Sequence, residues 1–103
     1  MSRKPKSAAL RELYDELIGE DPRKRAEYDD TFVSLEAAQL VYDMRTAAGL
    51  SQRELAKRVG TTASVICRLE DADYHGHTLA LLNRIASALG RQIELRAVPR
   101  EAA

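Results

Sequence analysis

The chain has 103 residues, which is the usual length of one domain. Its 16 basic and 16 acidic side chains cancel, so it lacks the positive net charge that is typical of nucleic-acid-binding proteins. Its single Cys excludes an intramolecular disulfide and fits a reducing cytoplasm, where we expect the protein to be located. No long apolar run follows the basic N-terminus, so we expect neither a signal peptide nor a membrane span.

The first 33 residues predict a basic tail followed by an acidic helical arm. Residues 1–6 are basic and have no apolar periodicity, so we expect a solvated tail. Residues 7–18 predict an amphipathic helix that Ser7 caps and Gly19 ends. Its apolar stripe has helical spacing and consists of Leu10, Leu13, Tyr14 and Leu17. This stripe must be buried, either against its own domain or against a partner protein or second copy, and the sequence favours neither.

A second arm helix is predicted for residues 23–30, because Asp21-Pro22 is a strong helix start. Asp29 and Asp30 oppose the helix dipole, so we expect the helix to end there and residues 31–33 to form a connector. Residues 10–30 carry eight acidic and four basic side chains, which points to a basic protein as the partner of the arm.

Residues 34–48 predict the first helix of a central domain, with Ser34 as its cap and Gly49 at its end. Arg45 falls on the inner stripe of this helix and therefore needs a partner. Two short helices follow, one over residues 52–59 and one that Thr62 caps and Glu70 ends, with Gly60 in the turn between them. This arrangement is the helix-turn-helix pattern, and residues 45–70 carry five basic and two acidic side chains.

The C-terminal third predicts a polar loop, one more helix and a strand. In the loop of residues 71–77, His75 and His77 are interpreted as solvent-exposed rather than metal-binding, because two histidines alone make a poor site. Thr78 caps a helix over residues 78–89. Residues 91–98 alternate as a strand does, with Ile93 and Leu95 on one side. We expect this strand to pair across a dimer or with a partner's sheet; the alternative is an extended tail packed on its own domain.

The helix-turn-helix residues resemble those of the Xre/Cro phage-repressor family. The matching residues are Leu50-Ser51-Gln52, Glu54-Leu55-Ala56, Val59-Gly60, Thr61-Thr62, Ile66 and Leu69-Glu70. The resemblance covers residues 35–89 and implies a mainly all-α, lambda-repressor-like bundle of about five helices. We therefore divide the chain into the tail and arm (1–33), the helix-turn-helix domain (34–90), and a dimerisation strand with its tail (91–103).

The resemblance also implies roles for individual side chains. Arg45 would pair with Glu70 in a buried ion pair that ties the first helix to the second helix of the motif. The residues facing DNA bases would be Ala63, Ser64 and Arg68, of which Arg68 can form a bidentate pair with guanine. The residues that contact phosphates or brace the motif would be Gln52, Arg53, Arg58 and Thr62, although Arg53 and Arg58 are equally consistent with solvated helix charges. Phage repressors often use glutamines at positions 63 and 64, so the operator sequence is not implied.

The whole layout is similar to HigA-type antitoxins, through the Asp-Pro-containing arm, the central motif and the C-terminal RQIELR segment. This similarity implies a homodimeric repressor that binds a palindromic operator in double-stranded DNA and autoregulates a HigBA-type operon. It also implies neutralisation of a basic RelE-like toxin, which the stripe Leu10, Leu13, Tyr14 and Leu17 would contact. The alternatives are a stand-alone regulator of a phage or mobile element, and a protein-interaction module without DNA binding, which the neutral charge favours. The sequence contains no catalytic set, no zinc spacing and no phosphate-binding loop, so we expect neither an enzyme nor a cofactor. Cys67 is interpreted as a half-exposed filler residue rather than a redox sensor.

Overall fold

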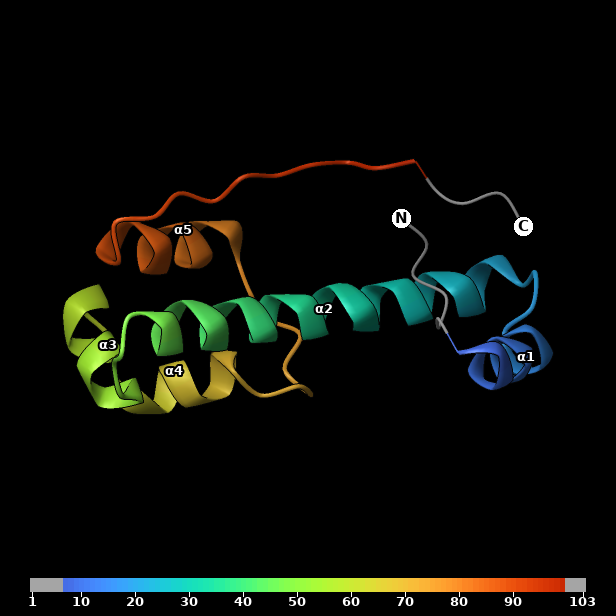
Figure 1. Ribbon diagram of the computed structural model, residues 1–103, viewed down its shortest axis with the longest axis horizontal. Coiled ribbons are helices and arrows are strands. Elements are labelled where there is room, and N and C mark those ends of the chain that lie inside the picture. The colour runs from blue at the N-terminus through green and yellow to red at the C-terminus, as the bar shows by residue number, and fades with distance from the viewer. Residues whose placement is uncertain (1–6, 100–103) are drawn as a thin grey trace. The chain divides into compact units, whose positions relative to one another are not determined.

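The computed structural model describes residues 7–99, which form five helices and no strand (Figure 1). The helices are α1 (Ala8–Leu17), α2 (Pro22–Ala47), α3 (Gln52–Val59), α4 (Ala63–Leu69) and α5 (Leu79–Ala88). The prediction of a mainly all-α chain with about five helices is therefore confirmed. The basic tail predicted for residues 1–6 lies outside the described residues. Within residues 7–99, no helix is both long enough and apolar enough to cross a membrane.

The chain divides into two compact units. One is Val33–Leu95, which we call the central unit. The described part of the other unit is residues 7–32 with residues 96–99, and we call residues 7–32 the arm. These two units are considered separately below.

α2 is one continuous helix where two were predicted. The predicted connector of residues 31–33 is helical, and Ser34 lies inside the helix instead of capping it. No Gly or Pro follows Pro22 before the end of the helix, and residues such as Thr31 and Val33 each cost only a few tenths of a kcal/mol in a helix. The predicted start was right, because Asp21 Oδ1 accepts a hydrogen bond from the Arg23 N–H at 2.9 Å.

The arm has an aromatic cluster in place of a buried leucine stripe. The ring centroids of Tyr14 and Tyr28 are 4.8 Å apart, and those of Tyr28 and Phe32 are 5.4 Å apart. Burial, followed by the nearby Tyr14 and Asp29, raises the pKa of Tyr28. Of the predicted α1 stripe only Tyr14 is buried, while the remaining members are 54%, 48% and 60% exposed: Leu10, Leu13 and Leu17.

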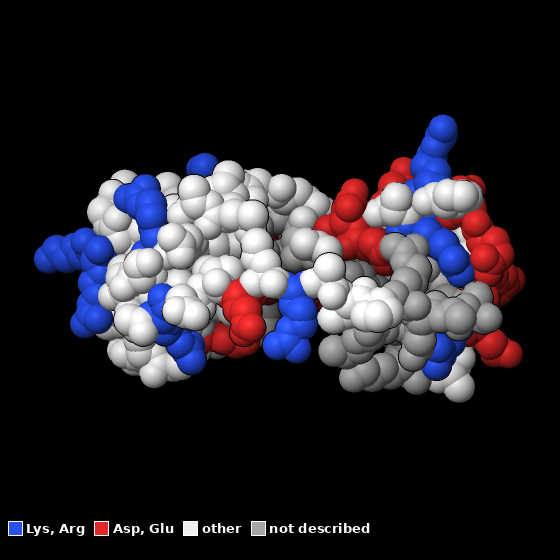
Figure 2. Space-filling model, turned by 90° about the horizontal axis from the view of Figure 1, so that it is seen from above, with Lys and Arg blue, Asp and Glu red and all other residues white. Residues whose placement is uncertain are grey.

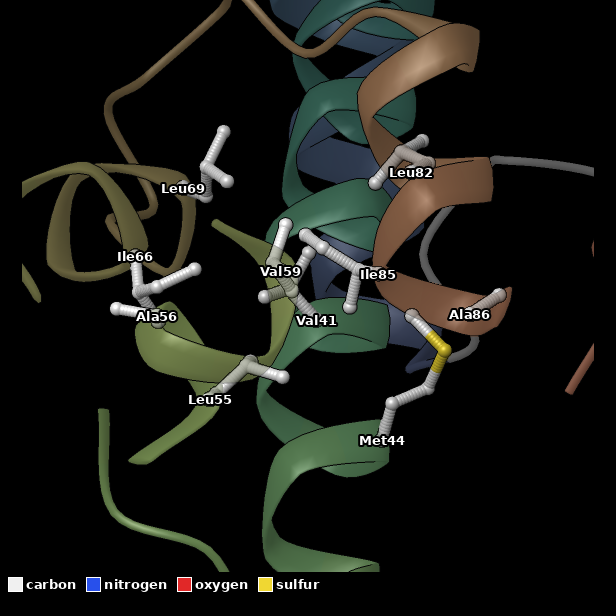
Figure 3. Packing of buried hydrophobic residues seen from close by; sticks show 10 residues of the cluster. All are labelled: Val41, Met44, Leu55, Ala56, Val59, Ile66, Leu69, Leu82, Ile85 and Ala86. Carbon is white, nitrogen blue, oxygen red and sulfur yellow. The ribbon is translucent and has the colours of Figure 1, made fainter. Parts of the chain in front are cut away.

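The hydrophobic core of the central unit joins the C-terminal half of α2 to α3, α4 and α5 (Figure 3). α2 lies between α4 and α5 in both Figure 1 and Figure 3. The core cluster consists of Val41, Met44, Leu55, Ala56, Val59, Ile66, Leu69, Leu82, Ile85 and Ala86. Because each helix contributes residues with almost no exposed surface, the core fixes how α3 and α4 are held.

The strand predicted for residues 91–98 is not formed in the described chain. Figure 1 draws them as an extended trace, but no strand lies beside them among residues 7–99, and a strand exists only where a second strand bonds to its backbone. Ile93 packs against the core of the central unit, as expected for a tail packed on its own domain, whereas Leu95 is 69% exposed.

Candidate nucleic-acid interface

α3 begins and ends at residues that determine its length. The Glu54 N–H donates to Ser51 Oγ at 3.1 Å, and the Ser51 N–H donates to Glu54 Oε1 at 3.0 Å, which together form a capping box. Hydrogen bonds from the Ser51 backbone and then its side chain lower the pKa of Glu54, which Arg58 lowers further. Gly60 ends the helix with a φ of 83°, a left-handed conformation that favours glycine.

α4 follows after a turn of three residues and is seven residues long. Thr62 caps it, because its Oγ1 accepts a hydrogen bond from the Val65 N–H at 3.3 Å. The Thr61 N–H returns to the Ala56 carbonyl at 2.9 Å, which closes the turn onto α3. We call α3, this turn and α4 the reading motif.

A hydrogen-bonded network joins α2 to both helices of the reading motif. Arg45 Nε lies 2.6 Å from Glu70 Oε2, and Arg45 Nη2 lies 2.9 Å from Glu70 Oε1. Gln52 Nε2 donates to Glu70 Oε1 at 3.1 Å, and Arg45 Nη1 donates to the Leu50 carbonyl at 2.9 Å. The side chains of Arg45 and Glu70 are 14% and 7% exposed. The structure thus brings the expected pair together and adds Gln52 to it as a brace.

The ion pair with Glu70 also affects the pKa of Arg45. The hydrogen bonds to Glu70 raise its pKa, against the opposing effect of burial. The guanidinium also lies over the Tyr42 ring, 5.4 Å from its centroid. Arg45 is therefore fully committed to internal contacts and is not a candidate for binding a ligand.

The three residues expected to face bases differ in exposure. Ser64 and Arg68 are exposed and lie four positions apart, so they share one face of α4. Ala63 is half-buried at the start of the helix. Arg68 forms no ion pair within residues 7–99, which leaves its guanidinium available to a ligand.

Basic side chains gather around α3. Arg53, Lys57 and Arg58 are exposed, and none of them forms an ion pair in the part of the chain that the structure describes. Figure 2 shows Lys and Arg side chains over the end of the central unit that contains α3. The amide of Gln52 donates to Glu70, and the hydroxyl of Thr62 accepts from the Val65 N–H, so both side chains have a bracing contact within the motif and each keeps a further donor.

Two contacts of the reading motif were not foreseen from the sequence. Arg84 Nη2 donates to the Val59 carbonyl at 2.8 Å, and His77 Nε2 lies 2.6 Å from the Leu69 carbonyl. The expectation of two solvent-exposed histidines was therefore wrong for His77, which is half-buried, and correct for His75. A side chain that binds a backbone carbonyl leaves no signature in the sequence, because every residue type supplies the carbonyl.

The described residues around the motif form no metal cluster, and one open cavity lies beside it. Among residues 7–99, no three His, Cys, Asp or Glu side chains are close enough to hold a metal ion. An open cavity of about 210 Å³ lies between α2 and the segment after α4, which is below the usual volume of a small-molecule site. Its lining residues are Leu35, Ala38, Gln39, Tyr42, Glu70 and Ala72. The exposed side chains of the motif are cations and hydroxyls, which can bind the surface of another molecule.

Known proteins share this part of the chain. The helix-turn-helix domain family matches residues 36–98. An uncharacterized HTH-type transcriptional regulator of Methanothermobacter thermautotrophicus is 47% identical over 53 residues, which covers 52% of this chain and 75% of that protein. No solved structure gives a significant match.

Proposed function

The chain belongs to the helix-turn-helix domain family, and we propose that it is a DNA-binding transcriptional regulator. One observation supports this most directly. The reading motif is fixed from within by Arg45, Glu70 and Gln52, while Ser64 and Arg68 on α4 remain exposed. A rigid helix with unpaired polar side chains on its outer face is what recognition of base edges requires.

In this proposal α4 lies in the major groove with its N-terminal residues against the bases. Arg68 donates two hydrogen bonds to guanine O6 and N7, which is worth about 1–3 kcal/mol of discrimination. Ala63 contacts a thymine methyl, and Ser64 donates to or accepts from a base. Arg53 and Arg58 neutralise phosphates, so the local basic surface supplies the attraction that the neutral chain as a whole lacks.

The test is binding to the DNA upstream of the gene that encodes this protein, measured against random DNA of equal length. Arg68→Ala should lose preference for the upstream DNA by about tenfold. Arg53→Ala should weaken binding to both DNAs. It should also reduce, by about one, the slope of the logarithm of the binding constant against the logarithm of the salt concentration. Arg23→Ala, which removes an exposed charge in the arm, is the matched control and should bind as the wild type does. If the wild type binds neither DNA at low salt, the protein is an interaction module and not a DNA-binding regulator.

We further propose that the protein binds a palindromic operator as a homodimer through residues 91–98. Seven residues of α4 contact too few bases for high specificity, and a dimer doubles the contacts at half-sites about 34 Å apart. Figure 1 draws the segment as an extended trace, and an extended backbone is the form that pairs with a strand of a second copy. Because Ile93 packs into its own core, Leu95 is the side chain available to the second copy. Leu95→Asp should convert a dimer to a monomer in sedimentation, and a wild-type monomer at 100 μM would count against the pairing.

The exposed leucines of α1 favour a second role, that of an antitoxin which neutralises a basic RelE-like toxin. Leu10, Leu13 and Leu17 form an apolar ridge on the arm, whereas Tyr14 is buried and is no longer a contact candidate. Among the charged side chains of the arm visible in Figure 2, Asp and Glu cover more surface than Lys and Arg, which complements a basic partner.

Co-expression with the product of a neighbouring gene for a small basic protein tests the antitoxin role. The wild type should co-purify with that protein, and Leu13→Asp should abolish co-purification while DNA binding persists. Ala8→Asp adds the same charge to the opposite face of α1, away from the apolar ridge, and serves as the control. A wild-type protein that binds DNA but retains no such partner would be a stand-alone regulator.

A further inference from the structure

The two helices of the reading motif each end at a carbonyl that a downstream side chain holds. Val59 is the last residue of α3, and its carbonyl accepts a hydrogen bond from Arg84 Nη2 of α5 at 2.8 Å. Leu69 is the last residue of α4, and its carbonyl lies 2.6 Å from Nε2 of His77 in the following loop. Both contacts are partly buried.

The chemistry of a helix end explains why these contacts form. The last carbonyls of a helix have no partner within it and carry the negative end of the helix dipole. A guanidinium satisfies both conditions, because it donates a hydrogen bond and carries a positive charge. At α4 the carbonyl can only accept, so Nε2 of His77 is the donor in this contact. Nδ1 of His77 is buried and has no partner within residues 7–99, so the Leu69 contact is the polar contact that places this ring.

The loop is shaped to present His77 to α4. The Tyr74 and His77 rings pack edge to face with centroids 5.1 Å apart, and the Tyr74 hydroxyl donates to the Gly76 carbonyl at 3.1 Å. A Cβ at Gly76 would overlap the Tyr74 ring, so only glycine allows this packing. The Tyr74 ring thus packs on the His77 ring, and Gly76 allows Tyr74 to take this position.

We propose that Arg84 and His77 are positioning residues for DNA recognition. They hold the C-terminal ends of α3 and α4, and so fix the angle at which the reading motif presents Ser64 and Arg68. The inference rests on the proposed function, because Arg84 and His77 act by orienting the side chains that are proposed to contact DNA bases. Neither residue needs to touch DNA, and this separates them from Arg53 and Arg58.

The test compares Arg84→Ala and His77→Ala with two controls, Arg23→Ala for loss of an exposed charge and Asn83→Ala for truncation beside Arg84. Each test variant should bind the upstream DNA about tenfold more weakly while its affinity for random DNA and its salt dependence stay unchanged. The conservative variants Arg84→Lys and His77→Gln each retain a donor and should recover most of the loss. All measurements are made on protein shown to be folded by circular dichroism, so a loss of stability alone does not produce the expected result.

Three results would overturn the assignment. A salt dependence that falls by about one ion would make Arg84 a phosphate contact. Equal weakening on both DNAs would indicate a contribution to general affinity and not to recognition, and unchanged binding to the upstream DNA would leave both residues without a role in recognition.

A readout without DNA distinguishes failure of this inference from failure of the proposed function. The amides of Gly60 and Thr61 bond to the Ala56 carbonyl at the end of α3. Arg84→Ala should speed their hydrogen exchange at least tenfold relative to amides in α2, because the end of α3 is released. If the exchange rates do not change, Arg84 does not hold the helix end, whatever the protein binds. If they change but the wild type binds no DNA, the proposed function fails and so does the role of Arg84 in it.

Discussion

The helices of the central unit and of the arm share the same alternation of apolar and polar residues, but the two regions differ in how far the apolar side chains are buried. In the central unit the apolar positions meet one another, and Leu55, Ile66 and Ile85 have no exposed surface. In the arm the leucines of α1 are about half exposed or more, and an aromatic cluster is buried in their place. Helical spacing therefore shows which face of a helix is apolar, but it does not show whether the chain itself covers that face.

The polar contacts differ between the two regions in the same way. Each region contains an Arg–Glu pair, but Glu70 is 7% exposed in the central unit and Glu20 is 78% exposed in the arm. Each also begins a helix with a residue suited to capping, yet Thr78 accepts a hydrogen bond from its helix and Ser7 does not. These matched residues allow the comparison to be tested one interaction at a time.

The largest difference is expected for leucine truncation. Leu55→Ala should destabilise the protein by about 2–5 kcal/mol, because it leaves a cavity in a closely packed core. Leu13→Ala, at a position that is 48% exposed, should cost less than about 0.5 kcal/mol. Urea unfolding followed by circular dichroism measures both, and equal losses would show that the arm leucine is covered after all.

The two glutamates should differ next most. Glu70→Ala leaves the Arg45 guanidinium without its partner, and we expect a loss of about 2–4 kcal/mol, because Arg45 keeps only a little contact with solvent. Glu20→Ala removes an exposed partner of Arg25 and should cost about 0–1 kcal/mol. Thermal unfolding of the two variants beside the wild type provides the measurement. A loss at Glu20 as large as that at Glu70 would remove this distinction between the regions.

Helix caps should give a smaller contrast. Thr78→Ala removes the acceptor for the Leu81 N–H, which lies 3.1 Å away, and should cost about 1 kcal/mol. Ser7→Ala removes a side chain that makes no capping bond and should leave stability unchanged within error. Denaturant midpoints of the two variants are sufficient to decide this, provided that the slopes of the transitions agree.

The smallest effect is expected on the pH dependence of stability. Glu54 has a pKa below its ordinary value of 4.5, so folding favours its ionised form. Its contribution is therefore complete above about pH 4.5 and is lost as the pH falls through the lowered pKa of the folded state. Glu54→Gln should flatten the acid side of the stability curve, and Ser51→Ala should do the same because it removes the hydroxyl side of the capping box. An unchanged curve in both variants would contradict this linkage.

Local chemistry explains which parts of the fold could be predicted from the sequence. Ser51, Thr62 and Thr78 each cap the helix expected of them, and Gly60 ends α3, because these features depend on neighbours within four residues. The Arg45–Glu70 pair came from resemblance and not from spacing, since its members are 25 positions apart.

The sequence-based predictions were wrong where contacts or cooperativity beyond the nearest residues decided the structure. Asp29 and Asp30 predict the end of a helix, but their cost is small beside the cooperativity of a helix that nothing interrupts. The strand at residues 91–98 needed a partner that the described chain does not supply. Arg84 and His77 bind backbone carbonyls, so only the folded chain shows their roles.

Cys67 gives the proposed interface a chemical reporter of its own. It is the single cysteine of the chain, and it lies exposed on α4 beside Arg68. A thiol-reactive dye will therefore label the protein at one known position without any engineered substitution. If DNA covers this face of α4, it shields that thiol, and the rate of alkylation then measures occupancy of the interface directly.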